Sequence, residues 1–111
     1  MENYSAIVAA AAMSKNYQGK FVEVHKRKDG SSVYFGAYRV MRIDADRIRF
    51  DDHGSYDIKL VKLIAKLVEA FAPEYTLVGQ PGHLSLNRKD GCMFQWNGQA
   101  SFDKDGNLLV V

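Results

Sequence analysis

Arginine and tyrosine side chains alternate through residues 20–50, and this segment carries the most chemistry in the chain. In an alternating strand pattern Tyr34, Tyr38, Arg42 and Arg49 share one sheet face. The segment holds eight basic and four acidic residues, so its net charge is +4. Guanidinium groups bind phosphates and carboxylates through paired hydrogen bonds, and exposed tyrosines offer flat surfaces to bases. The pattern indicates a surface that can bind an anion.

Two of these arginines are predicted to face each other across neighbouring strands. A tight turn at Ala45-Asp46 places Arg42 opposite Arg49. Like charges in this position destabilise a sheet by a few tenths to about 1 kcal/mol, and a bound anion would relieve the repulsion. The alternative is a solvated face whose arginines lean on neighbouring acids. The candidate ligand-binding residues of this surface are Arg42, Arg49, Tyr34, Tyr38 and Lys26.

Arg39 and Trp96 are two further ligand-binding candidates. Alternation places Arg39 on the apolar inner face, where a charge needs a partner. Glu69 or Asp57 would supply one, or the side chain would reach a sheet edge or hold a ligand carboxylate or phosphate. Trp96 either packs in the core or lines an apolar pocket between sheet and helix.

The remaining polar residues do not have the spacing of a metal or catalytic site. His25, His53 and His83 are isolated in the sequence, and Cys92 is the only thiol. We therefore predict no metal, no cofactor and no catalytic residue. The run Asp51-Asp52-His53 precedes a glycine and a helix start, which favours a turn and a cap. An enzyme with an acid–base pocket around His83 is the alternative.

The element that must position these residues is a central helix over residues 57–72. Apolar residues recur there at steps of three and four, and lysines fall on the opposite side. Asp57 or Ser55 can cap its first turn, and Pro73 stops it. The apolar stripe consists of Ile58, Leu60, Val61, Leu63, Ile64, Leu67, Val68 and Phe71.

Strands are predicted on both sides of this helix. Before it, a two-residue loop at Asp29-Gly30 pairs Val24 with Phe35 and Val22 with Ala37 in a three-stranded meander. The inner face of that meander is predicted to carry Val22, Val24, Phe35, Ala37, Met41, Ile43, Ile48 and Phe50, and its outer face Phe21, Glu23, His25, Tyr34, Tyr38, Val40, Arg42, Arg47 and Arg49.

The segment after the helix is predicted to form a four-stranded meander over residues 84–88, 92–96, 100–103 and 107–111, with a further strand over 74–79. Turn residues between apolar alternations place Leu86 opposite Phe94, Phe94 opposite Phe102 and Phe102 opposite Leu108. A first helix over residues 3–16 is capped by Asn3. The fold class is α+β: antiparallel β-meanders (βββ and ββββ) packed on one central amphipathic helix, with a short N-terminal helix, in a single domain over 1–111.

Length and composition narrow the class of protein and its cellular location. The 111 residues carry a net charge of +2, and 47% are hydrophobic. That size and balance are typical of one globular domain. One cysteine, no export segment and no apolar run of membrane length predict a cytoplasmic protein.

We expect a non-enzymatic binding module for a partner protein or small ligand, with no membrane partner. Nucleic-acid or phosphate binding through the basic, aromatic face is the alternative. Leu109 and Val111 are predicted to be exposed on an edge strand. A homodimer, or the N-terminal helix, would cover them.

Overall fold

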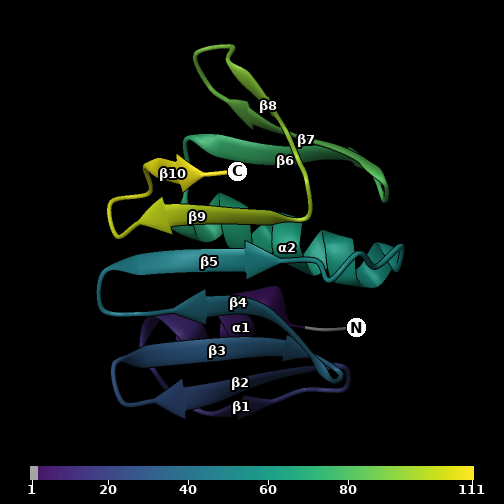
Figure 1. Ribbon diagram of the computed structural model, residues 1–111. Coiled ribbons are helices and arrows are strands. Elements are labelled where there is room, and N and C mark those ends of the chain that lie inside the picture. Colours follow the sequence, from purple (N-terminus) through teal and green to yellow (C-terminus); the bar gives the residue numbers. More distant parts are fainter. Residues whose placement is uncertain (1–2) are drawn as a thin grey trace.

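The computed structural model describes residues 3–111 and has an α+β fold with antiparallel sheets, as predicted (Figure 1). A seven-stranded sheet has the order β1-β2-β3-β4-β5-β9-β10, and a three-stranded sheet has the order β6-β7-β8. The elements are α1 (Tyr4–Ala12), β1 (Tyr17–Gln18), β2 (Val22–Arg27), β3 (Gly30–Phe35), β4 (Tyr38–Ile43), β5 (Arg47–Asp51), α2 (Ile58–Phe71), β6 (Tyr75–Gln80), β7 (His83–Arg88), β8 (Met93–Gln95), β9 (Gln99–Asp103) and β10 (Leu108–Val110).

The predicted central helix is confirmed as α2. The Asp57 side chain caps it by accepting a hydrogen bond from the Lys59 backbone N–H at 2.8 Å. Six apolar residues of the stripe are buried: Leu60, Val61, Leu63, Ile64, Leu67 and Val68. Ile58 was predicted to belong to the stripe, but it is 72% exposed because it lies in the first turn, beyond the core.

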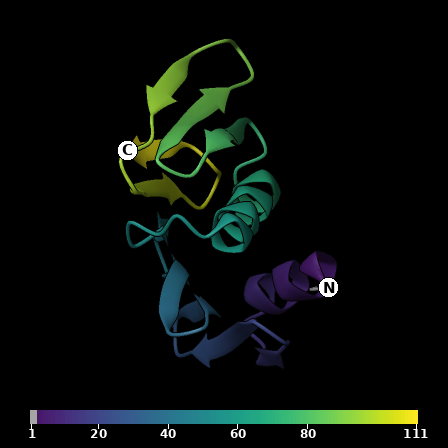
Figure 2. The ribbon, with the colours of Figure 1, turned by 90° about the vertical axis from the view of Figure 1, so that its right-hand side faces the viewer.

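Both helices cover the same face of the seven-stranded sheet, and the other face carries no helix (Figure 2). The short helix α1 is capped by Asn3 as predicted, but it ends at Ala12 rather than near Asn16. Its Ala11 carbonyl accepts a hydrogen bond from the buried Ser31 hydroxyl at 2.8 Å, which holds α1 against β3. The open face opposite the helices is where outward-pointing side chains meet solvent. No helix among residues 3–111 has the length and apolarity needed to cross a membrane.

The register of the first hairpin differs from the prediction by two residues. The loop is Lys28-Asp29, so Val24 pairs with Val33 and Val22 with Phe35. A two-residue slip preserves which face each side chain occupies. Gly30 is therefore the first residue of β3, where a Cβ would collide with the Ile43 carbonyl oxygen of β4.

The predicted inner position of Arg39 is wrong because of a β-bulge in β4. Met41 pairs with Val33, but Arg39 pairs with Tyr34, which leaves Val40 as the extra residue. The bulge turns Arg39 outward, where it is exposed. Val40, predicted to lie on the outer face, is fully buried instead.

The predicted C-terminal meander is split between the two sheets. β9 leaves β8 and pairs with β5, placing Phe102 opposite Ile48 and Ala100 opposite Phe50. The expected pairing of Phe94 with Phe102 is therefore wrong. Two other predicted pairings are confirmed: Leu86 with Phe94 in the three-stranded sheet, and Phe102 with Leu108 in the seven-stranded sheet.

The edge strand β10 exposes Leu109 and Val110, whereas Val111 packs partly against the core. The prediction of Val111 as an exposed residue was therefore wrong. A register shift between Leu108 and Val110 explains the difference, because it moves Val110 opposite Ser101.

Candidate functional site

One row of side chains crosses five strands on the open face. His25, Ser32, Arg42, Arg49 and Ser101 each lie opposite the next residue of the row in the strand register. The predicted opposition of Arg42 and Arg49 is confirmed. Small serines flank the two arginines. One of them, Ser32, has a hydroxyl oxygen that is buried and makes no hydrogen bond within residues 3–111.

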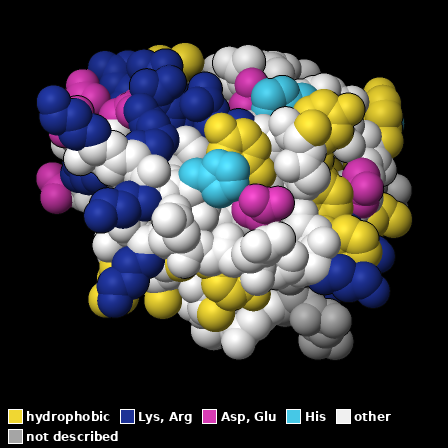
Figure 3. All heavy atoms as spheres, turned by 90° about the horizontal axis from the view of Figure 1, so that it is seen from below, with side chains coloured by type: hydrophobic (Ala, Val, Ile, Leu, Met, Phe, Trp, Pro, Cys, Tyr) yellow, Lys and Arg dark blue, Asp and Glu magenta, His cyan; other side chains and the backbone are white. Residues whose placement is uncertain are grey.

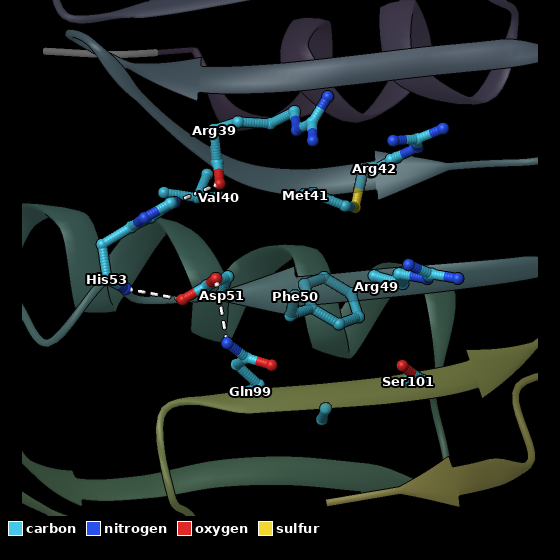
Figure 4. Close-up of a pocket in the computed structure, with 11 residues that line it drawn as sticks. Arg39, Val40, Met41, Arg42, Arg49, Phe50, Asp51, His53, Gln99 and Ser101 are labelled. Atoms are coloured by element: carbon cyan, nitrogen blue, oxygen red, sulfur yellow. Dashed lines mark hydrogen bonds between the residues drawn. The ribbon is translucent and has the colours of Figure 1, made fainter.

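A hollow of about 260 Å³ opens on this face between β4, β5 and β9. Figure 4 shows that three arginine side chains run in the same direction along the strands. Because Ala100 and Ser101 are small, β9 leaves room beside Arg49. Its charged, imidazole and amide lining residues are Arg39, Arg42, Arg49, Asp51, His53 and Gln99.

Of the three arginines, only Arg42 has an ion-pair partner within residues 3–111. Its Nε lies 2.8 Å from Oδ1 of Asp44, which also accepts a hydrogen bond from Arg27 at 3.1 Å. Burial raises the pKa of Asp44, but the hydrogen bonds from both arginines outweigh it and leave the pKa below its ordinary value. Arg39 and Arg49 make no such contact with the described residues. Arg39 and Arg49 therefore line the hollow without an ion pair, and the Asp51 carboxylate that shares this hollow accepts from the His53 N–H and from Gln99 instead.

Further basic side chains lie near Asp44, at one end of the open face. Lys104 donates to the Asp44 carbonyl oxygen at 3.0 Å, and Arg47 lies 3.6 Å from Asp46. Figure 3 shows lysine and arginine side chains gathered at the upper left of the molecule. Neither Lys104 nor Arg47 lines the hollow. They contribute positive potential around it rather than contacts inside it.

The opposite end of the hollow is built around His53. Its Nε2 lies 2.6 Å from the Arg39 carbonyl oxygen, and its backbone N–H donates to Oδ1 of Asp51 at 2.8 Å (Figure 4). The ring packs against Tyr38, with 5.3 Å between ring centroids. Gln99 donates to the second Asp51 oxygen at 3.3 Å. These contacts fix an imidazole and a phenol side by side at the start of β4.

The turn predicted for Asp51-Asp52-His53 is confirmed by its hydrogen bonds. Asp51 accepts from the His53 N–H, and Asp52 accepts from the Gly54 N–H at 2.8 Å. His53 itself has a φ of +55°, as tight turns often require. Among residues 3–111, no three His, Cys, Asp or Glu side chains are placed to hold a metal ion.

A second aromatic pair lies on the open face, on β2 and β3. The His25 and Tyr34 rings are 4.7 Å apart, and Tyr34 pairs with Arg39 across the β3–β4 register. The bulge that moves Arg39 outward therefore places a cation directly opposite Tyr34. The structure brings together Arg39, Arg42, Arg49 and Tyr34 on one face. Tyr38 lies opposite Phe35 and alternates with the outward-facing Arg39, so it falls on the side of the sheet that faces the helices, and its predicted outer position is wrong.

Two further predicted site residues do not join this group. Lys26 lies opposite Ser31, on the side of the sheet that faces the helices, because it alternates with His25. Trp96 is buried, and its indole N–H donates to Oδ2 of Asp52 at 2.9 Å. This hydrogen bond ties the loop after β5 to the chain before β9. Trp96 also lines a separate hollow of about 200 Å³ beside Tyr56.

Sequence reasoning missed His53, Gln99 and Ser101 as parts of the hollow. Alternation with the apolar residues of 99–103 marks Gln99 and Ser101 as outward-facing, but only the pairing of β9 with β5 places them beside Arg49. Nothing local indicates that the His53 ring returns to the Arg39 carbonyl. The chain matches no protein-family model, no curated protein and no solved structure.

Proposed function

We propose that this protein is a non-enzymatic binding module that holds an anionic, phosphate-bearing ligand on the open face of its seven-stranded sheet. The observation that carries the proposal is the pair of guanidinium groups of Arg39 and Arg49. Both line one hollow and make no ion pair within residues 3–111. Arg42 completes the set, since Asp44 holds its Nε and leaves its terminal nitrogens without an ion pair.

Phosphate suits this arrangement better than a single carboxylate. A guanidinium group donates two parallel hydrogen bonds to adjacent oxygens, and phosphate offers three or more oxygens to several such groups. A bound phosphate would also remove the repulsion between Arg42 and Arg49, which are paired across strands. The repulsion therefore lowers the stability of the unliganded sheet slightly, and a bound phosphate would restore that stability.

The polar groups at the His53 end favour binding over catalysis. The His53 Nε2 is engaged by the Arg39 carbonyl oxygen, and Asp51 is engaged by the His53 N–H and by Gln99. These contacts give the imidazole and the carboxylate a structural role in holding the turn. His83, the alternative acid–base candidate, is exposed at the start of β7 and lies outside this hollow.

The test is a titration with inorganic pyrophosphate at low salt, followed by the NMR signals of the arginine Nε–Hε groups. Signals of Arg39 and Arg49 should shift. Arg49→Gln should weaken binding about tenfold, the scale of one charge-assisted hydrogen bond. Arg47→Gln is the matched control, because it removes the same charge from the same strand outside the hollow. It should change the affinity by less than about twofold.

Two results would overturn the proposal. One is the absence of any shift at Arg39 and Arg49 up to about 10 mM pyrophosphate, a concentration above a millimolar dissociation constant. The other is an equal loss of affinity in Arg47→Gln and Arg49→Gln. That result would assign the binding to net charge rather than to the hollow.

A further inference from the structure

We infer that the phosphate-bearing ligand of the open face is a single-stranded nucleic acid whose bases stack on the aromatic rings beside the arginines. The inference rests on the proposed phosphate binding and specifies the class of ligand. It depends on three features of the open face: the spread of the cations, the position of the rings and the shape of the hollow.

The cations are distributed along the sheet rather than gathered at one point. Arg39 and Arg42 are three residues apart on β4, which is about 10 Å of strand, and Arg49 lies one strand further across. Positive groups spaced along a surface follow a chain of phosphates, as in grooves that bind single strands. A lone phosphate group would engage only part of the set.

The rings lie next to these cations on the same face. Tyr34 packs on His25, and the His53 ring lines one end of the hollow. Arg39 lies between Tyr34 and His53, because it pairs with Tyr34 and its carbonyl oxygen contacts His53. Bases stack on tyrosine and histidine rings, and their phosphates then fall near the neighbouring guanidinium groups. Each cation therefore has a stacking partner within one or two strands.

The shape of the site favours a polymer over a small molecule. A pocket for a small ligand encloses most of that ligand's surface. Here the hollow lies open on the sheet face, with no helix above it (Figures 2 and 4). A single strand can lie across such a surface and make contacts at several points. Gln99 lines the His53 end, and although its side-chain nitrogen donates to Asp51, its amide oxygen can accept from a base edge.

The experiment compares two fluorescent probes of equal charge by anisotropy. One is an oligothymidylate of about twelve nucleotides, within the usual range of site sizes. The other is an abasic deoxyribose-phosphate chain of the same length. The oligothymidylate should bind about tenfold more tightly, the equivalent of about 1.4 kcal/mol, which is in the range of one stacked base. A polyglutamate peptide of the same charge should bind more weakly than either.

Variants separate the rings from the charges. Tyr34→Leu should lower the affinity for the oligothymidylate about tenfold and leave the abasic chain unaffected. Arg49→Gln should weaken both probes and reduce the slope of log K against log salt by about 0.7, the contribution of one phosphate contact. Tyr56→Leu is the matched aromatic control, because Tyr56 is 74% exposed and lies in a different hollow. It should change neither affinity.

The outcomes distinguish this inference from the proposed function. Equal binding of the two probes, with loss in Arg49→Gln, would overturn the role of the bases and leave phosphate binding in place. Polyglutamate binding as tight as that of the oligothymidylate would also overturn it. If neither probe binds and pyrophosphate shifts no arginine signal, both proposals fail.

Discussion

Replacing Arg49 by glutamine should stabilise the fold while it weakens anion binding. The side chain lies opposite Arg42, and it has no ion pair within residues 3–111. Like charges in this position cost a few tenths to about 1 kcal/mol. Asp44 offsets part of the Arg42 charge, so we expect a gain in the free energy of unfolding of about 0.5 kcal/mol. In a chain of 111 residues this raises Tm by about 2 °C.

The assay is thermal and urea unfolding in a buffer free of phosphate, because a bound anion would stabilise the parent protein. The gain should be largest at about 20 mM salt and should shrink at about 0.5 M, where the Debye length is only a few ångströms. Arg47→Gln is again the control. Arg47 lies 3.6 Å from Asp46 and opposite Asp103, so its loss should cost between zero and about 0.5 kcal/mol.

A loss of stability in Arg49→Gln would refute the idea that the two arginines repel each other in the unliganded sheet. A gain of equal size at low and high salt would refute its electrostatic origin. It would then point to the better packing of a smaller side chain.

The other predictions concern the framework around the site. Gly30→Ala should lower the free energy of unfolding in urea by about 2–3 kcal/mol, because the new Cβ would collide with the backbone of β4. Gly36→Ala is the comparison: Gly36 has a φ of +59° and open space around it, so this change should cost about 1 kcal/mol. Equal costs for the two variants would contradict the collision. Trp96→Phe removes the indole donor from the buried Asp52 carboxylate and should lower the free energy of unfolding by about 1.5–3 kcal/mol, and a loss below about 0.5 kcal/mol would contradict this role. The pKa of Asp44 is lowered in the fold, so its contribution is complete above about pH 4 and is lost as the pH falls through the folded value. Asp44→Asn should therefore make unfolding less dependent on pH below about pH 4, and an unchanged acid limb would show that Asp44 contributes nothing there.

The sequence predicted the parts of the fold that follow from local periodicity. The α2 stripe and the outward alternation of Tyr34, Arg42 and Arg49 needed only steps of two, three and four residues. The register of β4 and β5 followed from keeping apolar residues on one face. These are properties of neighbouring residues, which a single chain reveals directly.

The parts that failed depend on choices that local patterns leave open. The bulge at Val40 reverses Arg39 with no glycine or proline to mark it. The pairing of Phe102 with Ile48 rather than Phe94 satisfies the same alternation, so the pattern cannot select between them. The arrangement of the two sheets around α2 selects the pairing of β9 with β5. That pairing also places Ser101 beside the hollow.

The pairing of β5 with β9 also governs the order in which this protein can fold. Asp51 and Gln99 are direct partners, although 47 residues separate them in the chain. Closing so long a loop costs entropy before any contact repays it, and a ribosome must complete β9 before the loop can close. Until then the edge of β5 is unpaired and open to other strands, which is a hazard during synthesis. The wall that β9 adds to the hollow is then absent as well, so a complete ligand site forms only after the seven-stranded sheet has closed.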